Sequence, residues 1–153
     1  MEDGALRAPQ YDTHMTVKTV RRSVATRGNG EILDVTGDVA EAVRGSGIAN
    51  GIATVFVTGS TAALTTLEFE PGLVHDLKAA FDRLYPREME YRHHERWGDD
   101  NGHSHVRASM LGPSLVVPVS DGELTLGPWQ QIVLVDFDTH PRTREFLVQM
   151  MGE

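Results

Sequence analysis

The sequence predicts a single α+β domain, with strands and helices mixed around one core. Two patterns indicate this class. Strand-like and helix-like runs follow one another without the regular strand–helix–strand alternation of a doubly wound sheet. Asp121-Gly122 stands between two short strand-like runs, and this dipeptide is a hairpin signal that indicates antiparallel pairing. A chain of 153 residues also buries enough surface to need neither disulfides nor a structural metal.

The first third of the chain predicts a strand, a helix and a buried strand. Residues 1–13 read as a flexible tail, so the domain spans residues 14–153. The segment HMTVKTVRRSV (14–24) alternates and is rich in β-branched residues, which predicts a strand. Thr36 is the expected N-cap of a helix whose apolar positions and terminating glycines are Val39, Ala42, Val43, Gly45 and Gly47.

The middle of the chain predicts paired strands followed by a helix. GIATVFVTG (51–59) is an apolar run typical of a buried strand, and LTTLEFE (64–70) is its antiparallel partner or continuation. A helix over 71–85 begins with Pro71 in the favoured first position, and Pro86 stops it. Its apolar stripe consists of Leu73, Leu77, Ala80, Phe81 and Leu84.

The last third predicts one short helix and then strands. Asp100 or Asn101 is the expected cap of a helix that runs to Ser109 and closes at Gly112. Strand-like runs follow at 114–119, 124–126, 129–137 and 143–150.

Composition excludes several classes of function. The formal charge is −8, from 14 basic and 22 acidic side chains, which argues against a nucleic-acid partner. No apolar run is long enough to span a membrane, and the first residues lack a signal peptide. The absence of cysteine excludes thiolate sites and fits a cytoplasmic location.

The segment YRHHERWGDDNGHSH (91–105) contains four of the seven histidines. Three interpretations of this segment are open: a metal site, a general acid–base site and a polar surface loop. His93 and His94 are adjacent and point in different directions, so at most one of them ligates a metal. His103 and His105 diverge by about 200° on a helix, which leaves one ligand there as well.

Two further motifs have ordinary structural interpretations. RGSGIANG (44–51) follows a helix rather than a strand, so we interpret it as a helix-ending loop and not as a phosphate loop. In GSTAA (59–63), Ser60 and Thr61 either bind an anion or satisfy a tight turn. On the helix over 71–85, the helical spacing places His75 opposite the apolar stripe, where it is solvated.

Three blocks of the sequence together resemble the YjbQ family, which is described as secondary thiamine-phosphate synthases. They are SLVVPVSDGELTLGPWQQI (114–132), NGHSHVRASMLG (101–112) and VFVTGSTAAL (55–64), within a match that covers about residues 15–152. The chain departs from the family pattern at Gly59 and Ser60, which replace a His-Thr pair of many members.

The resemblance implies a compact fold with a mixed, bulged, sandwich- or barrel-like β-core, two to three helices and a homotrimeric assembly. It also implies a metal site formed by His75, His93 and His105, with His103 and His94 as substitutes. Zinc is the expected metal, and magnesium is the alternative alongside a diphosphate substrate. Because His75 is expected on an outward helix face, only a neighbouring subunit would bring it to the site.

The function implied by the resemblance is a metal-binding transferase. It would join hydroxymethylpyrimidine diphosphate to hydroxyethylthiazole phosphate and release pyrophosphate. Arg107 is the expected phosphate partner, with hydrogen bonds from Ser60, Thr61 and Ser109. Asp76 or Glu68 would orient a ligating histidine.

Two alternatives remain open beside the transferase. The first is a trimeric protein that binds a metal or small ligand without turnover. The second is a metal-assisted phosphate-ester hydrolase. The transferase requires Arg107 to face the histidine pocket, whereas an Arg107 paired with Asp99, Asp100 or another neighbouring acid would be an ordinary surface charge.

Overall fold

The computed structural model describes residues 14–153. The expected flexible tail, residues 1–13, lies outside the described residues. Within the described range the elements follow the order β1 (Thr16–Thr26), β2 (Glu31–Asp34), α1 (Thr36–Ser46), β3 (Gly51–Val57), β4 (Ala62–Leu67), α2 (Pro71–Leu84), α3 (Arg92–Trp97), α4 (Gly102–Leu111), β5 (Ser114–Ser120), β6 (Glu123–Leu124), β7 (Gln131–Asp136) and β8 (Arg142–Gly152).

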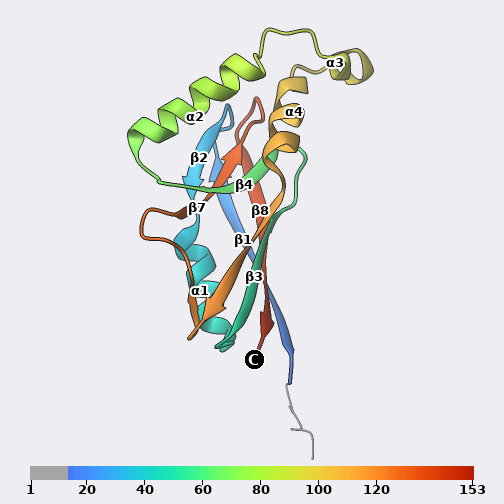
Figure 1. Cartoon of the computed structure of the whole chain (residues 1–153). Coiled ribbons are helices and arrows are strands. Elements are labelled where there is room, and N and C mark those ends of the chain that lie inside the picture. The colour runs from blue at the N-terminus through green and yellow to red at the C-terminus, as the bar shows by residue number, and fades with distance from the viewer. Residues whose placement is uncertain (1–13) are drawn as a thin grey trace, which may run out of the picture.

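The strands form two antiparallel sheets that face each other across the core (Figure 1). One sheet has five strands in the order β1-β8-β3-β5-β6, and the other has three in the order β2-β7-β4. The long strand β1 pairs with β8 along its whole length, from Thr16 opposite Gly152 to Thr26 opposite Arg142. The predicted α+β class is confirmed, with four helices in the described range instead of two to three.

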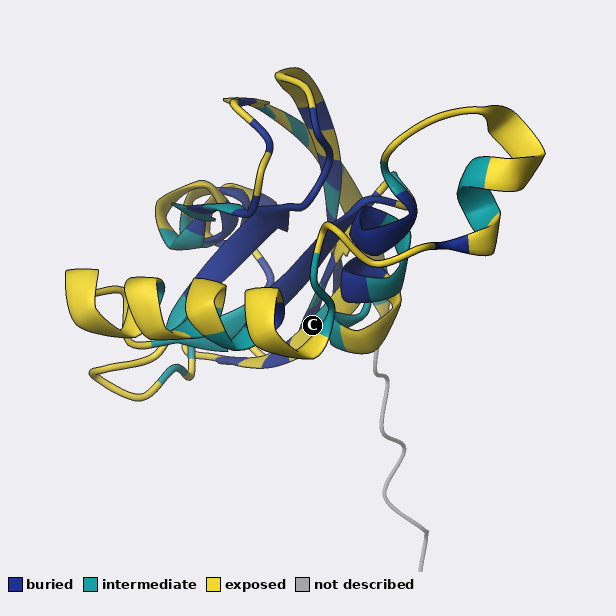
Figure 2. Cartoon of the chain, turned by 90° about the horizontal axis from the view of Figure 1, so that it is seen from above, coloured by how far each residue is buried: buried dark blue, intermediate teal, exposed yellow. Residues whose placement is uncertain are grey.

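Alternation along the strands builds the main core. In β8 every second side chain is buried, including Phe146, Val148 and Met150, and these pack against the apolar face of α1. A second, smaller core lies under α2 and α4, where Phe81 meets Phe137 edge-on with ring centroids 4.8 Å apart. Figure 2 shows that α2 turns most of its surface to solvent and that α3 stands out from the body.

Most predicted elements are present, and two were not foreseen. The turn at Asp121 and Gly122 has φ angles of 52° and 76°, as a hairpin of this type requires, so that prediction is confirmed. The helix expected over 71–85 is α2, which begins at Pro71. Strand β2 and helix α3 occupy segments for which the sequence predicted neither a strand nor a helix.

The expected cap at Thr36 is wrong. Val35 is the N-cap residue of α1 and makes no side-chain capping bond, while Thr36 is already helical. The Thr36 hydroxyl is engaged by β7 instead, because it accepts a hydrogen bond from the Ile132 N–H at 2.8 Å. Of the helices in the described range, none is long and apolar enough to cross a membrane.

Candidate functional site

A buried ion pair lies where β7 ends, and it anchors the candidate site. Asp136 is fully buried and accepts two hydrogen bonds from Arg144, from Nε at 2.8 Å and from Nη2 at 2.7 Å. The Thr26 hydroxyl donates to the same carboxylate at 2.5 Å. A buried carboxylate is tolerated only when it is paired and hydrogen-bonded, and Arg144 and Thr26 provide these partners for Asp136.

A second buried carboxylate, Asp138, connects the surrounding segments. It accepts hydrogen bonds from the Thr139 N–H at 2.8 Å, Thr61 at 3.0 Å, Arg142 at 2.5 Å and Asn101 at 3.4 Å. Burial alone would raise the pKa of Asp138, but these donors outweigh burial and hold the pKa below its ordinary value. The charged carboxylate therefore joins β7, the loop before β4 and the start of α4.

Two imidazole rings face each other beside this network. His93 on α3 and His105 on α4 have ring centroids 4.3 Å apart, and His93 Nε2 lies 3.4 Å from an Asp99 carboxylate oxygen. Burial, followed by the neighbouring His93, lowers the pKa of His105. His105 is therefore neutral at pH 7, and its free nitrogen lone pair is available to bind a metal or accept a proton.

The other two histidines of the segment hold the local structure. His94 Nε2 accepts a hydrogen bond from the Gly102 N–H at 3.0 Å, which fixes α3 against the start of α4. His103 is buried, and its Nδ1 atom has no hydrogen-bond partner among the described residues. Burial, followed by nearby Arg107, lowers the pKa of His103.

A cavity of about 270 Å³ opens next to His105. Ser60 and Ser109 line it together with His105 and small or apolar residues, namely Gly59, Ala62, Ala108 and Pro113. The Ser109 hydroxyl donates to the His105 carbonyl at 2.8 Å. Thr61 is buried behind this cavity, where it donates to Asp138 and accepts from Arg144.

The structure thus brings together His93, His105, Ser60 and Ser109 from the set predicted from sequence. The others lie elsewhere in the chain. His75 and Asp76 are exposed on α2, and Glu68 is exposed just before that helix.

Arg107 is buried and does not face the paired imidazoles. Its Nε and Nη2 donate to the Tyr85 carbonyl at 3.0 and 2.7 Å, and Nη2 also contacts Asp82 at 2.9 Å. These bonds fasten the end of α2 to α4. The acid that pairs with Arg107 is Asp82 rather than Asp99 or Asp100, and because Arg107 is buried it is not the exposed charge of the alternative interpretation.

The histidine pair of one chain supplies too few ligands for a complete metal site. Within residues 14–153 no group of three or more histidine or carboxylate side chains is placed to hold a metal ion. His93 and His105 supply two imidazole nitrogens, whereas a metal of the zinc type takes at least three protein ligands. A further ligand must come from outside the pair.

Sequence reasoning missed the buried charges of the network. Asp136 and Asp138 follow the apolar run IVLV at the end of β7, and Arg144 occupies an inward position of β8. The signal in the sequence was available, because charged residues at inward positions of a strand are rare unless they are paired. Their partners were not visible, since Thr26 and Thr61 come from distant segments.

The chain matches known proteins over nearly its full length. Residues 20–153 match the family described as UPF0047 protein YjbQ-like. A UPF0047 protein of Archaeoglobus fulgidus is 36% identical over 137 residues, which cover 90% of this chain and 98% of the relative. The UPF0047 protein YugU of Bacillus subtilis is 34% identical over 139 residues, with 90% and 97% covered.

Solved structures agree with these sequence matches. A YbjQ-like protein of unknown function from Sulfolobus solfataricus P2 has a TM-score of 0.87 and 37% identity, covering 92% of this chain and all of that one. A hypothetical protein from Aeropyrum pernix K1 has a TM-score of 0.83 and 35% identity, with 89% and 99% covered.

These findings correct the expected function. The assignment as a metal-binding transferase of the thiamine-phosphate synthase type is wrong, because the matching family and its members are described without that activity and one solved member as of unknown function. The position of Arg107 agrees with this correction, since its hydrogen bonds go to the end of α2.

Proposed function

Because the chain belongs to the UPF0047 family of YjbQ-like proteins, we propose a function from its own side chains: binding of a divalent metal ion through His93 and His105. The observation that carries the proposal is the distance of 4.3 Å between the centroids of these two rings, beside a cavity that Ser60 and Ser109 line. Imidazole nitrogens suit zinc and other late transition metals, whereas magnesium prefers oxygen ligands. Zinc is therefore the first choice.

The surroundings of the pair support metal binding. His105 is neutral at pH 7 because burial lowers its pKa, so a metal need not displace a proton from it. Asp99 lies 3.4 Å from His93 Nε2, and a carboxylate on one imidazole nitrogen orients the ring and strengthens the other nitrogen as a ligand. Ser60 and Ser109 offer hydroxyl groups to a small polar molecule bound beside the metal.

We further propose that the chain assembles as a homotrimer and that a neighbouring copy completes the site. The outer sheet face, defined by Val17, Ile52, Phe56, Val116, Leu147 and Met151, carries apolar side chains that remain exposed or half-buried. These residues lie on neighbouring strands, with Ile52 opposite Met151 and Phe56 opposite Leu147. We interpret these exposed apolar side chains on one sheet face as a protein–protein contact. A cytoplasmic location stays a prediction.

His75 is the proposed third ligand, supplied by another copy. It is exposed on α2, and a histidine on an outward helix face reaches a metal only across a subunit boundary.

Zinc titration of tag-free protein tests the proposal. His93→Ala and His105→Ala should each weaken zinc binding at least about tenfold, as loss of a ligand removes one of few metal bonds. His75→Ala should do the same in the assembled protein. His140→Ala, at an exposed histidine outside the site, is the matched control and should leave binding unchanged. Unaltered affinity and stoichiometry in both His93→Ala and His105→Ala would refute the site.

A further inference from the structure

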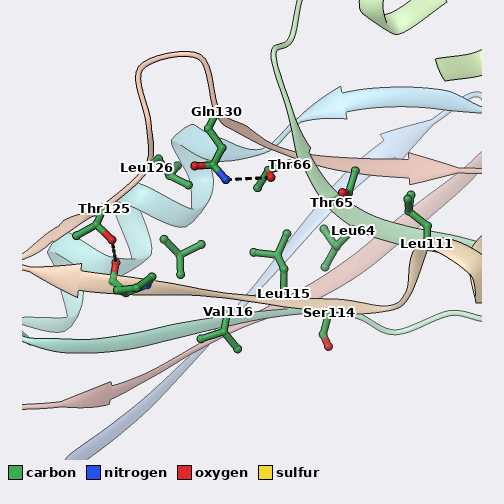
Figure 3. Close-up of a pocket in the computed structure, with 12 residues that line it drawn as sticks. Leu64, Thr65, Thr66, Leu111, Ser114, Leu115, Val116, Thr125, Leu126 and Gln130 are labelled. Carbon is green, nitrogen blue, oxygen red and sulfur yellow. Dashed lines mark hydrogen bonds between the residues drawn. The ribbon is translucent and has the colours of Figure 1, made fainter. Parts of the chain in front are cut away.

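A second cavity lies at the seam where the two sheets meet without pairing. β4 is an edge of the three-stranded sheet, and β5 belongs to the other sheet. Between them is a cavity of about 320 Å³, which we call the seam cavity (Figure 3). It shares no lining residue with the cavity beside His105, so binding here is tested separately from metal binding.

Backbone groups of β4 are left open toward the seam. The Leu64 N–H donates across the seam to the Gly112 carbonyl at 3.0 Å, whereas the Thr61 carbonyl accepts from the Phe137 N–H, which continues β7. Because backbone groups of successive residues in a strand point to opposite edges, Leu64 and Thr66 both face the seam. The N–H and C=O of Thr66 are therefore not used by β7.

On the opposite wall of the cavity, backbone groups of β5 are also unpaired toward the seam. The Pro113 carbonyl accepts from Val57 of β3, while the Pro118 carbonyl accepts from Thr125 on the seam side. By the same alternation, the N–H and C=O of Val116 face the seam. Among residues 14–153 no hydrogen bond occupies these groups of Val116 or Thr66.

The side chains around the cavity are uncharged. Leu115 points toward Gln130 across the cavity, and Val116 points away from it (Figure 3). Apolar walls come from Leu64, Leu111, Leu115, Val117 and Leu126, and hydroxyl or amide groups come from Thr65, Thr66, Thr125 and Gln130. A charged ligand would lose its hydration here without gaining a partner, so the cavity favours a neutral one.

Hydrogen bonds bound the cavity at its two ends along the seam and limit the length of a ligand, while its outer side is open to solvent at the exposed residues Ser114, Thr125 and Gln130. The hydrogen bond from Leu64 to Gly112 closes one end, and the bond from Gln130 Nε2 to the Thr66 hydroxyl at 3.1 Å narrows the other. A continuous peptide strand cannot pass through both closures. The occupant that fits is a small molecule.

We propose that the seam cavity binds a small neutral ligand that carries an amide group next to a branched apolar chain. Its amide would pair with the open backbone groups of Thr66 and Val116, and its apolar part would contact Leu115 and Val117. Hydrogen bonds to these backbone groups would orient the ligand, and contact with the apolar walls would strengthen its binding.

N-acetyl-L-leucinamide is a suitable probe, followed by backbone amide shifts in two-dimensional NMR. We expect saturable shifts at Thr66, Leu115 and Val116, with a dissociation constant on the order of millimolar for a ligand of this size. Free leucine, a zwitterion with the same side chain, should bind at least about tenfold more weakly because its charges find no partner. Absence of saturable shifts at these amides would overturn the proposal, as would equal binding of leucine.

Val116→Pro tests the backbone contact directly. Proline removes the N–H that faces the seam and spares the pairing with β3, and Pro118 already occupies an equivalent position of the same strand. Val116→Ala keeps the N–H and is the matched control. The proline variant should bind the probe at least about tenfold more weakly, and the alanine variant normally.

Folding of the proline variant is checked by unchanged amide shifts in β3. If it does not fold, Leu126→Trp fills the cavity from the β6–β7 connection and should abolish the probe shifts. Normal probe binding by a folded Val116→Pro or Leu126→Trp protein refutes the site.

Discussion

Among residues 14–153 the buried charged side chains have ion-pair or hydrogen-bond partners, whereas one buried side-chain nitrogen, Nδ1 of His103, has none. Asp136 and Asp138 have all their charge compensated by Arg144, Arg142 and neighbouring hydroxyls. His103 differs, because it is 3% exposed and its Nδ1 has no partner in the described part of the chain. Protonation of that ring would place an uncompensated charge in the interior beside Arg107.

His103 should make the stability of the protein depend on pH. Burial lowers its pKa in the folded state, so the unfolded chain binds a proton first as the pH falls below about 6.5. The free energy of unfolding should therefore decrease from pH 7 toward pH 5, by at most about 1.4 kcal/mol per pH unit from this group.

His103→Phe keeps a ring at this position and removes the titration. Its urea-unfolding midpoint should vary less steeply over the same pH range than that of the wild-type protein. An identical pH dependence in both proteins would show that the acid sensitivity arises at another group.

The boundaries of helices and strands were predictable where a residue restricts its own backbone. Pro71 begins α2, and the Asp121-Gly122 turn joins β5 to β6, because each of these residues restricts its own backbone. β2 has four residues and owes its strand geometry to pairing with β7, which no local pattern reveals. α3 has no buried residue, so its sequence contains no apolar stripe that would predict a helix.

Gly102 controls how α3 is set on α4. A Cβ atom at this position would lie 2.4 Å from Tyr91 Cβ and 3.0 Å from His94 Nε2, both fixed parts of the α3 entry. Gly102→Ala should therefore displace α3 and destabilise the fold by about 1–3 kcal/mol, the usual cost of overpacking. It should also weaken zinc binding, because His93 moves with α3.

Gly45→Ala is the control for this substitution. Gly45 lies in α1 with open space around its Cβ position, so the same change should stabilise by about 0.5–1 kcal/mol. Thermal unfolding of both variants measures the difference. A Gly102→Ala protein as stable as wild type would mean that α3 does not depend on this contact.

The candidate site was predictable in its residue types and only partly in its assembly. The expectation that a helix separates His103 from His105 is confirmed, and it leaves His105 as the ring available beside His93. The buried network of Asp136, Asp138 and Arg144 depends on contacts between residues far apart in sequence, which spacing along the chain does not encode. The proposed role of His75 as the third metal ligand depends on contact with a second copy of the chain.

At the scale of the whole molecule, the outer sheet face should decide the assembly. Phe56 lies on that face, in β3 between Leu147 of β8 and Ser114 of β5. Phe56→Lys would place an unpaired charge in a subunit contact and should reduce the measured mass from trimer toward monomer in light scattering at micromolar concentration.

Leu84→Lys is the matched control, because Leu84 is also an exposed apolar residue but lies at the end of α2. It should leave the trimer intact. A wild-type protein that is already monomeric at that concentration would exclude the assembly and the intersubunit role of His75.

The pairing of β1 with β8 joins the first described strand to the last one, as the adjacent blue and red strands in Figure 1 show. On the ribosome, β1 therefore emerges well before β8 and stays without this partner until β8 has been synthesised. Its eleven residues present open backbone groups throughout that interval. The five-stranded sheet cannot be completed before then, and a chain truncated within β8 would leave both β1 and β3 unpaired along that side.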